Sequence, residues 1–197
     1  MRSITRLILL TAALAAPALG ADDAKKPDPA AMQAAMEQMA KTGPEHEALA
    51  KTVGSWTIEE TMWMDPSAPP MTAKHKSTRT STLEGKWIRE ELVGEFMGKP
   101  YSAIGFNGYD TTAKQYVSSW MHTASTDLTV MKGQSADGGK TIVLHGTMEH
   151  CPGVDGPMAM RMVVANESAD KMTCTMFGTP QGGAETKMFE MVYTRAK

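Results

Sequence analysis

Six polar and aromatic residues between positions 91 and 161 have types and a spacing that suit recognition of a small molecule. Trp120 and His122 lie two residues apart in a predicted strand, so both side chains point to the same face. The other four, on neighbouring predicted strands, are Glu91, Asn107, Tyr109 and Arg161. A few polar groups converging on an apolar interior are typical of a ligand pocket. We therefore predict that these six residues bind a small apolar or amphipathic ligand.

The same residues allow two other interpretations. Arg161 could simply pair with a carboxylate such as Glu60 or Glu91, and several of the polar side chains could face solvent. Alternatively, His122 with Glu91 or Glu60 could act as an acid–base pair in a small-molecule enzyme, which would require His122 to hydrogen-bond a buried carboxylate. The sequence contains no G-x-S-x-G, H-E-x-x-H, C-x-x-C or phosphate-binding glycine motif. The sequence therefore neither establishes nor excludes catalysis, and it indicates no cofactor.

The chain is unusually rich in methionine, with 18 in 197 residues. Thioethers bind Cu(I), and His145, Met148, His150 and Cys151 lie close together in sequence, so copper or haem binding is a further alternative. Met158, Met160 and Met162, however, alternate as the buried face of a strand does, and methionine fills irregular cores. We therefore favour methionines that line a core.

Charge and the N-terminal segment limit the partners and the location. The 20 Lys and Arg are balanced by 22 Asp and Glu, and nucleic-acid binding needs a concentrated basic surface, so we expect no nucleic-acid partner. In residues 1–20, two arginines precede an apolar stretch that ends in Ala18-Leu19-Gly20, the pattern of a cleavable signal peptide. No other segment is apolar enough to span a membrane. We predict a periplasmic or secreted protein.

The elements that must position these residues follow from hydrophobic periodicity. Residues 21–30 are charged and contain proline, which indicates a flexible leader, and residues 31–52 indicate short helices, whose Met32, Met36 and Met39 we expect to pack across a barrel mouth. From Gly54 the period changes to two, and turn residues recur between the segments. The predicted strands are 55–64, 72–83, 86–96, 101–109, 114–123, 126–134, 140–149, 158–166, 171–178 and 186–195. Short connections between so many strands predict an all-β protein, an antiparallel up-and-down β-barrel of about ten strands over 54–197, with a short N-terminal helical segment.

The two cysteines belong to this predicted barrel. Cys174 should lie opposite about Val163 on the preceding strand, whereas Cys151 belongs to the loop before that strand. At about 3.3 Å per residue the sulfurs would be on the order of 20 Å apart, beyond disulfide reach. A bridge would require the loop to fold over the barrel end.

Motifs at the two ends of the predicted barrel resemble those of known proteins. Gly54-Ser55-Trp56 on the first strand and Tyr193-Thr194-Arg195 on the last resemble the calycin (lipocalin-related) arrangement, which implies that Gly54, Trp56 and Arg195 close one end. A closer resemblance, to the bacterial domain of unknown function 1579 family, is carried by the runs GPEHEALAKTVGSW, MWMDPSAPPMT, GEFMGKP, GYDTTAKQYVSSW and MFEMVYTR, in this order. This resemblance implies a calycin-like barrel and carries over no catalytic residues.

Overall fold

The computed structural model describes residues 28–64 and 68–197. The predicted signal peptide, residues 1–20, and all but the end of the predicted leader lie outside the described residues. Within the described residues, no helix is both long and apolar enough to cross a membrane.

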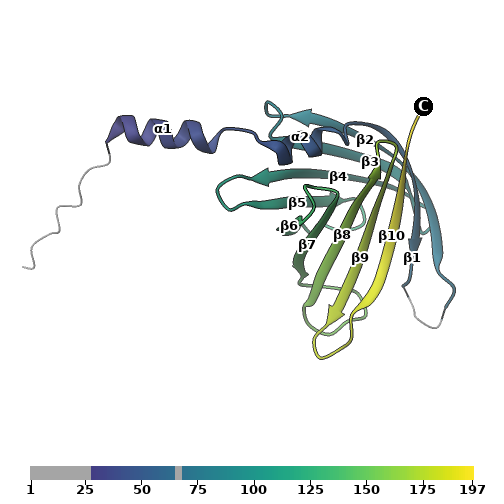
Figure 1. Ribbon diagram of the computed structural model, residues 1–197. Helices are drawn as coiled ribbons and strands as arrows, with labels where there is room; N and C mark the ends of the chain where they lie inside the picture. The colour runs from purple at the N-terminus through teal and green to yellow at the C-terminus, as the bar shows by residue number, and fades with distance from the viewer. Residues whose placement is uncertain (1–27, 65–67) are drawn as a thin grey trace, which may run out of the picture.

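Ten antiparallel strands form a closed barrel (Figure 1). Each strand pairs with its neighbours in the chain, and β1 pairs with β10 to close the sheet. The strands are β1 (Gly54–Met62), β2 (Met71–Thr82), β3 (Trp87–Phe96), β4 (Lys99–Asp110), β5 (Gln115–His122), β6 (Thr129–Gln134), β7 (Thr141–Met148), β8 (Met158–Ser168), β9 (Lys171–Pro180) and β10 (Thr186–Arg195). The predicted up-and-down barrel of about ten strands is confirmed.

Alternation of side chains along each strand explains why these segments form a barrel. In β1, Trp56, Ile58 and Met62 are buried, whereas Thr57 and Glu59 between them are exposed. This period of two turns the apolar side chains to the barrel interior and the polar ones to solvent. Several of the connections between strands contain only two to four residues.

The hairpin between β3 and β4 is one of these short connections. Met97 and Gly98 both have positive φ, at 52° and 74°. Two successive residues with positive φ are the signature of a type I′ turn, whose twist matches that of the flanking strands.

Two helices precede the barrel, and only the second packs on it. In α2 (Pro44–Ala50), His46 and Leu49 are buried, and Leu49 belongs to the barrel core. In α1 (Pro29–Met39) no residue is buried, and the helix extends away from the barrel (Figure 1). The prediction that Met32, Met36 and Met39 pack across a barrel mouth is wrong, because all three are exposed and α2 already covers the adjacent end.

Trp56 and Arg195 lie together at the end of the barrel beside α2. The Arg195 guanidinium lies 4.3 Å from the Trp56 ring centroid, a distance suited to a cation–π contact. It also donates hydrogen bonds to the carbonyl oxygens of Lys51, Val53 and Ala169 at 2.8–2.9 Å. Gly54 permits this approach, since a Cβ atom there would lie 2.5 Å from Arg195 Nη1.

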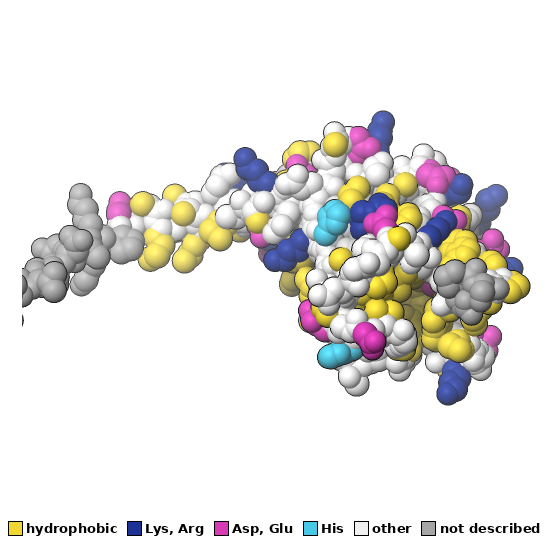
Figure 2. All heavy atoms as spheres, turned by 90° about the horizontal axis from the view of Figure 1, so that it is seen from below, with side chains coloured by type: hydrophobic (Ala, Val, Ile, Leu, Met, Phe, Trp, Pro, Cys, Tyr) yellow, Lys and Arg dark blue, Asp and Glu magenta, His cyan; other side chains and the backbone are white. Residues whose placement is uncertain are grey.

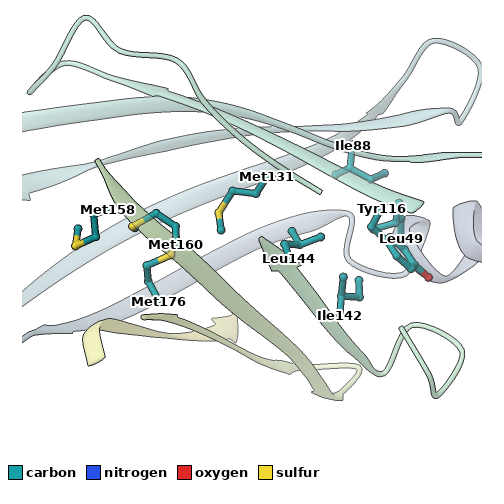
Figure 3. Packing of buried hydrophobic residues seen from close by; sticks show 9 residues of the cluster. All are labelled: Leu49, Ile88, Tyr116, Met131, Ile142, Leu144, Met158, Met160 and Met176. Carbon is teal, nitrogen blue, oxygen red and sulfur yellow. The ribbon is translucent and has the colours of Figure 1, made fainter. Parts of the chain in front are cut away.

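The buried apolar side chains form two clusters inside the barrel. One surrounds Trp56 and Leu92 near the closed end. The other runs along the interior, with Leu49 and Tyr116 near α2 and Met158, Met160 and Met176 gathered farther away (Figure 3). The space between these side chains is not completely filled, and that space is the candidate site.

Candidate functional site

The barrel encloses a cavity of about 1040 Å³. Its lining runs from Leu49 of α2 to Phe96, Ala124 and Lys187 at the opposite end of the strands. Viewed from the side away from α2, hydrophobic side chains gather in a hollow of the surface (Figure 2). The volume is at the upper end of the range of about 300–1,000 Å³ that small-molecule pockets occupy.

Methionines form much of the cavity lining. Eleven of the 18 line it, namely Met62, Met64, Met131, Met148, Met158, Met160, Met162, Met172, Met176, Met188 and Met191. We call the six on one side the methionine wall: Met158, Met160, Met162, Met176, Met188 and Met191, on β8, β9 and β10. The prediction that alternating methionines line a core is confirmed. Gly178 of β9 makes room for two of them, because a Cβ atom there would lie 2.6 Å from Met188 Sδ and 2.7 Å from Met158 Sδ.

Another part of the cavity lining is polar and aromatic. We call it the polar wall: Glu60, Arg79, Glu90, Trp120 and His122, on β1, β2, β3 and β5. Glu60, Arg79 and Glu90 are at most 6% exposed. Because burying charged groups is unfavourable unless they are paired, their contacts determine how this wall is built.

Arg79 and Glu90 form the inner part of the polar wall. Arg79 Nε lies 3.7 Å from Glu90 Oε2, and Ser77 Oγ donates a hydrogen bond of 2.7 Å to Glu90 Oε1. Burial, together with the nearby charge of Glu90, raises the pKa of the Cys174 thiol to about 12 and raises the pKa of Tyr193 well above its ordinary value. Both groups are therefore neutral at physiological pH, and the thiol is not a nucleophile.

An aromatic cluster around Tyr101 forms the outer part. The Tyr101 ring lies 5.8 Å from His75, 5.6 Å from His122 and 5.9 Å from Phe96, measured between centroids. Burial raises the pKa of Tyr101, although a hydrogen bond with Trp120 opposes the shift. Burial lowers the pKa of His122, with Asp127 opposing, so the neutral imidazole is favoured. Its Nδ1 is buried and has no hydrogen-bond partner in the structure.

Three of the six residues predicted to bind a ligand line the cavity: Asn107, Trp120 and His122. Tyr109 is half-buried beside α2, with its ring 5.0 Å from that of Tyr116 and 6.0 Å from that of His46. It supports the end of the barrel and is not part of the lining. That these residues contact a ligand stays a prediction.

The expectation that Glu91 and Arg161 face the interior is wrong. Glu90 points inward and Glu91 therefore outward, where it pairs with Arg89. Likewise Arg161 lies between the inward-facing Met160 and Met162, so its side chain lies on the outer surface. There it forms a two-point ion pair with Glu185 and stacks on Phe177 at 4.0 Å.

Arg79 and Glu90, the two innermost charged residues, are not among the site residues predicted from the sequence. Arg79 ends the alternation His75, Ser77, Arg79 in a segment without apolar side chains, so neither face of the strand could be identified as the buried one. For Glu90 a signal exists, since Ile88 and Leu92 have the same parity and flank it. In each case the deciding information is the register with the neighbouring strand, where Arg79 pairs with Glu90.

A buried histidine–carboxylate pair exists in the barrel, but it does not involve His122. His75 Nε2 lies 2.8 Å from Glu60 Oε2, and both side chains are at most 8% exposed. The pairing of His122 with Glu60 or Glu91, which an acid–base function would require, is not made. The diagonal position of His75 and Glu60 on adjacent strands, β2 and β1, brings them together instead.

The residues considered for metal binding are dispersed. His145 and His150 are exposed, whereas Met148 and Cys151 line the cavity. Over residues 28–64 and 68–197, no group of three or more His, Cys, Asp or Glu side chains is arranged to hold a metal ion. Cys151 and Cys174 are both free, and Cys174 pairs with Val164, one residue from the expected register.

Two solved structures have a similar fold. The crystal structure of Rv2717c from M. tuberculosis has 14% sequence identity and a TM-score of 0.54, with 80% of this chain and 100% of that chain covered. The S-type phycobiliprotein lyase CPES from Guillardia theta has 13% identity and a TM-score of 0.53, covering 82% of this chain and 97% of that one. At these identities the similarity shows the fold alone.

Comparison of sequences gives the family. No curated protein matches the chain in sequence. Residues 41–195, which include α2 and the whole barrel, match the family model described as "Protein of unknown function (DUF1579)", and the chain therefore belongs to this family.

Proposed function

We propose that this protein binds a small apolar or amphipathic molecule inside its barrel. The observation that carries the proposal is the cavity of about 1040 Å³, which is lined by methionines together with a few buried polar groups. Interiors are normally packed to crystal-like density, so a space of this size is costly unless something fills it. Apolar lining with few polar groups is the usual composition of small-molecule sites.

The similarity to a phycobiliprotein lyase supports the same class of function. The name of that protein indicates that it acts on phycobiliproteins. The shared fold supports only the general idea of a ligand held in the barrel, and no residue role is taken from it.

Binding of a neutral fluorescent probe, N-phenyl-1-naphthylamine, tests the proposal. We expect saturable binding by the purified protein. Met160→Trp should weaken it, because Met160 is 3% exposed on the methionine wall and an indole would occupy cavity space. Met121→Trp is the matched control, since Met121 is 39% exposed on the outer face of β5. Equal weakening by both substitutions, or no saturable binding at all, would contradict the proposal.

Native mass spectrometry of protein purified from its own host provides a second test. A bound molecule that leaves on denaturation is expected, and its mass would begin to identify the ligand. Protein that is always ligand-free and binds no probe would rule out the function.

We also propose that the protein acts outside the cytoplasm, on the basis of the signal-peptide pattern in residues 1–20. Intact-mass measurement of the protein from its host should give a chain that begins after Gly20. A full-length chain in the cytoplasmic fraction would contradict this location.

A further inference from the structure

Arg79 is a buried cation whose hydrogen-bonding capacity is largely unused. It lines the cavity and is 6% exposed. Among the described residues its one hydrogen-bond acceptor is the thioether of Met172, 3.2 Å from Nη1. Nε is buried and has no hydrogen-bond partner there. A guanidinium carries five N–H donors and sulfur is a weak acceptor, so most of this capacity is left for another partner.

Glu90 balances the charge of Arg79 without satisfying its donors. The closest approach, 3.7 Å from Arg79 Nε to Glu90 Oε2, is longer than a hydrogen bond. The other oxygen, Oε1, already accepts a hydrogen bond from Ser77. The pair is therefore complete as a charge pair and incomplete as a hydrogen-bonded pair.

The other buried polar atoms without partners do not offer the same opportunity. His75 Nδ1 lies against the backbone at Gly94, and His75 does not line the cavity. The Tyr116 hydroxyl lies beside Gly139, under α2. His122 is only half-buried. Lys187 also lines the cavity, but it is partly exposed and pairs with Glu190. Arg79 is thus the buried charged donor with unused N–H groups that lines the cavity.

We propose that Arg79 donates a hydrogen bond to a neutral acceptor, a carbonyl oxygen, at the inner end of an otherwise apolar ligand. This rests on the proposed function and names the chemical class of its ligand. The carbonyl lies against the polar wall, and the apolar body of the ligand packs along the methionine wall, whose flexible thioethers adapt to its shape.

The charges around Arg79 are the reason for choosing a neutral acceptor. Glu90 already compensates Arg79, and Glu60 adds a second buried carboxylate, which His75 contacts. A ligand carboxylate would bring a further negative charge toward both glutamates in a medium of low dielectric constant. A ligand cation would be repelled by Arg79 and would offer it no acceptor. A carbonyl uses the free donors and leaves the charge balance unchanged.

Competition against bound N-phenyl-1-naphthylamine tests the choice, with three ligands of equal chain length: 2-dodecanone, dodecanoate and dodecylammonium. We expect the ketone to compete about tenfold or more better than either ion, because either ion would disturb the charge balance around Arg79 in a medium of low dielectric constant. Arg79→Met combined with Glu90→Gln should remove this preference while the probe still binds. Arg161→Met is the control, because Arg161 lies outside the barrel and pairs with Glu185.

The outcomes separate this inference from the proposed function. Failure of the probe and of all three competitors to bind would overturn both. Probe binding with a preference for dodecanoate or dodecylammonium, or with no preference, would overturn the role of Arg79 alone. An unchanged preference for the ketone in the double variant would also overturn it.

A measurement on the unaltered protein keeps the test valid if the double variant fails to fold. We expect the C=O stretching frequency of [2-13C]dodecan-2-one bound to the protein to be lower than in a hydrocarbon solvent. The reason is that hydrogen bonding to a guanidinium weakens the C=O bond. A band at the hydrocarbon position would show that no donor contacts the carbonyl and would overturn the inference.

Discussion

The two walls of the cavity are built from different chemistry, although both belong to one continuous sheet. On the polar wall, charged and aromatic side chains are held by specific contacts, such as His75 to Glu60 at 2.8 Å and Ser77 to Glu90 at 2.7 Å. On the methionine wall, unbranched side chains pack within the apolar clusters, and Met158, Met160 and Met176 lie together (Figure 3). Hydrogen bonds and ion pairs have narrow geometry, whereas thioether chains adopt many rotamers at similar energy.

Because of this difference, we expect the two walls to contribute differently to ligand binding. A wall with fixed donors and acceptors can orient a ligand and discriminate its polar group. A wall of methionines can accommodate apolar bodies of different shape at little cost. The barrel therefore combines a selective side with a tolerant side, and the following experiments test whether that contrast is real.

The largest effect is expected from breaking the buried charge pair of the polar wall. Glu90→Leu leaves Arg79 buried without a carboxylate, which should lower the free energy of unfolding by about 3–5 kcal/mol. Urea denaturation measures it. The neighbouring Glu91→Leu is the matched control, because Glu91 pairs with Arg89 at the surface and should cost only about 0–1 kcal/mol. Similar losses in the two variants would mean that the inner pair does not support the wall.

An intermediate loss of stability is expected when a glycine beside each wall is replaced by alanine. In Gly94→Ala the new Cβ would lie 2.2 Å from His75 Nδ1 and 2.8 Å from the Lys74 carbonyl oxygen, so rigid groups must move, at a cost of about 1–3 kcal/mol. In Gly178→Ala it would meet the sulfurs of Met158 and Met188, which can rotate away. We expect a cost below about 1 kcal/mol there. Thermal and urea unfolding compare the two, and a greater cost at Gly178 would reverse the contrast.

A smaller effect on stability is expected from stiffening the methionine wall. Met160→Leu conserves volume and should cost less than about 1.5 kcal/mol. The change should appear in binding, as a narrower range of apolar probes accepted, because leucine has fewer rotamers than methionine. Displacement assays with linear and polycyclic probes measure this range. An unchanged range would show that the thioethers do not provide the tolerance.

The smallest expected effect is a pH dependence of the free energy of unfolding that arises from His122. Burial lowers its pKa below the unfolded value of about 6.5, so the unfolded chain takes up a proton first. The contribution of His122 to stability is therefore complete above about pH 6.5 and is lost as the pH falls toward its pKa in the folded protein. His122→Gln should flatten the decline in stability between neutral and mildly acid pH, measured by urea unfolding. His145→Gln, on the exposed outer face, should leave the decline unchanged. If the His122 variant declines as steeply as the unaltered protein, His122 is not the titrating group.

Much of the fold could be predicted because local signals agree along the chain. The alternation of Trp56 and Ile58 with Thr57, and the turn residues between strands, locate the strands to within a few residues of their observed bounds. Around Trp120 and His122 the inward face was also predicted, because residues two positions apart share a face of the strand. Elsewhere, residues such as Arg161 and Glu91 were placed on the wrong face, since a shift by one position exchanges inside and outside.

The sequence by itself determined the barrel, its number of strands and the use of methionine as lining, because these depend on a period of two and on composition. Only the tertiary structure decided which charged residues share the interior. Arg79 meets Glu90, and Glu60 meets His75, through the register of β1, β2 and β3. It also decided that α1 stands apart with its methionines exposed. These outcomes depend on contacts between separate segments, which side-chain periodicity within one segment does not encode.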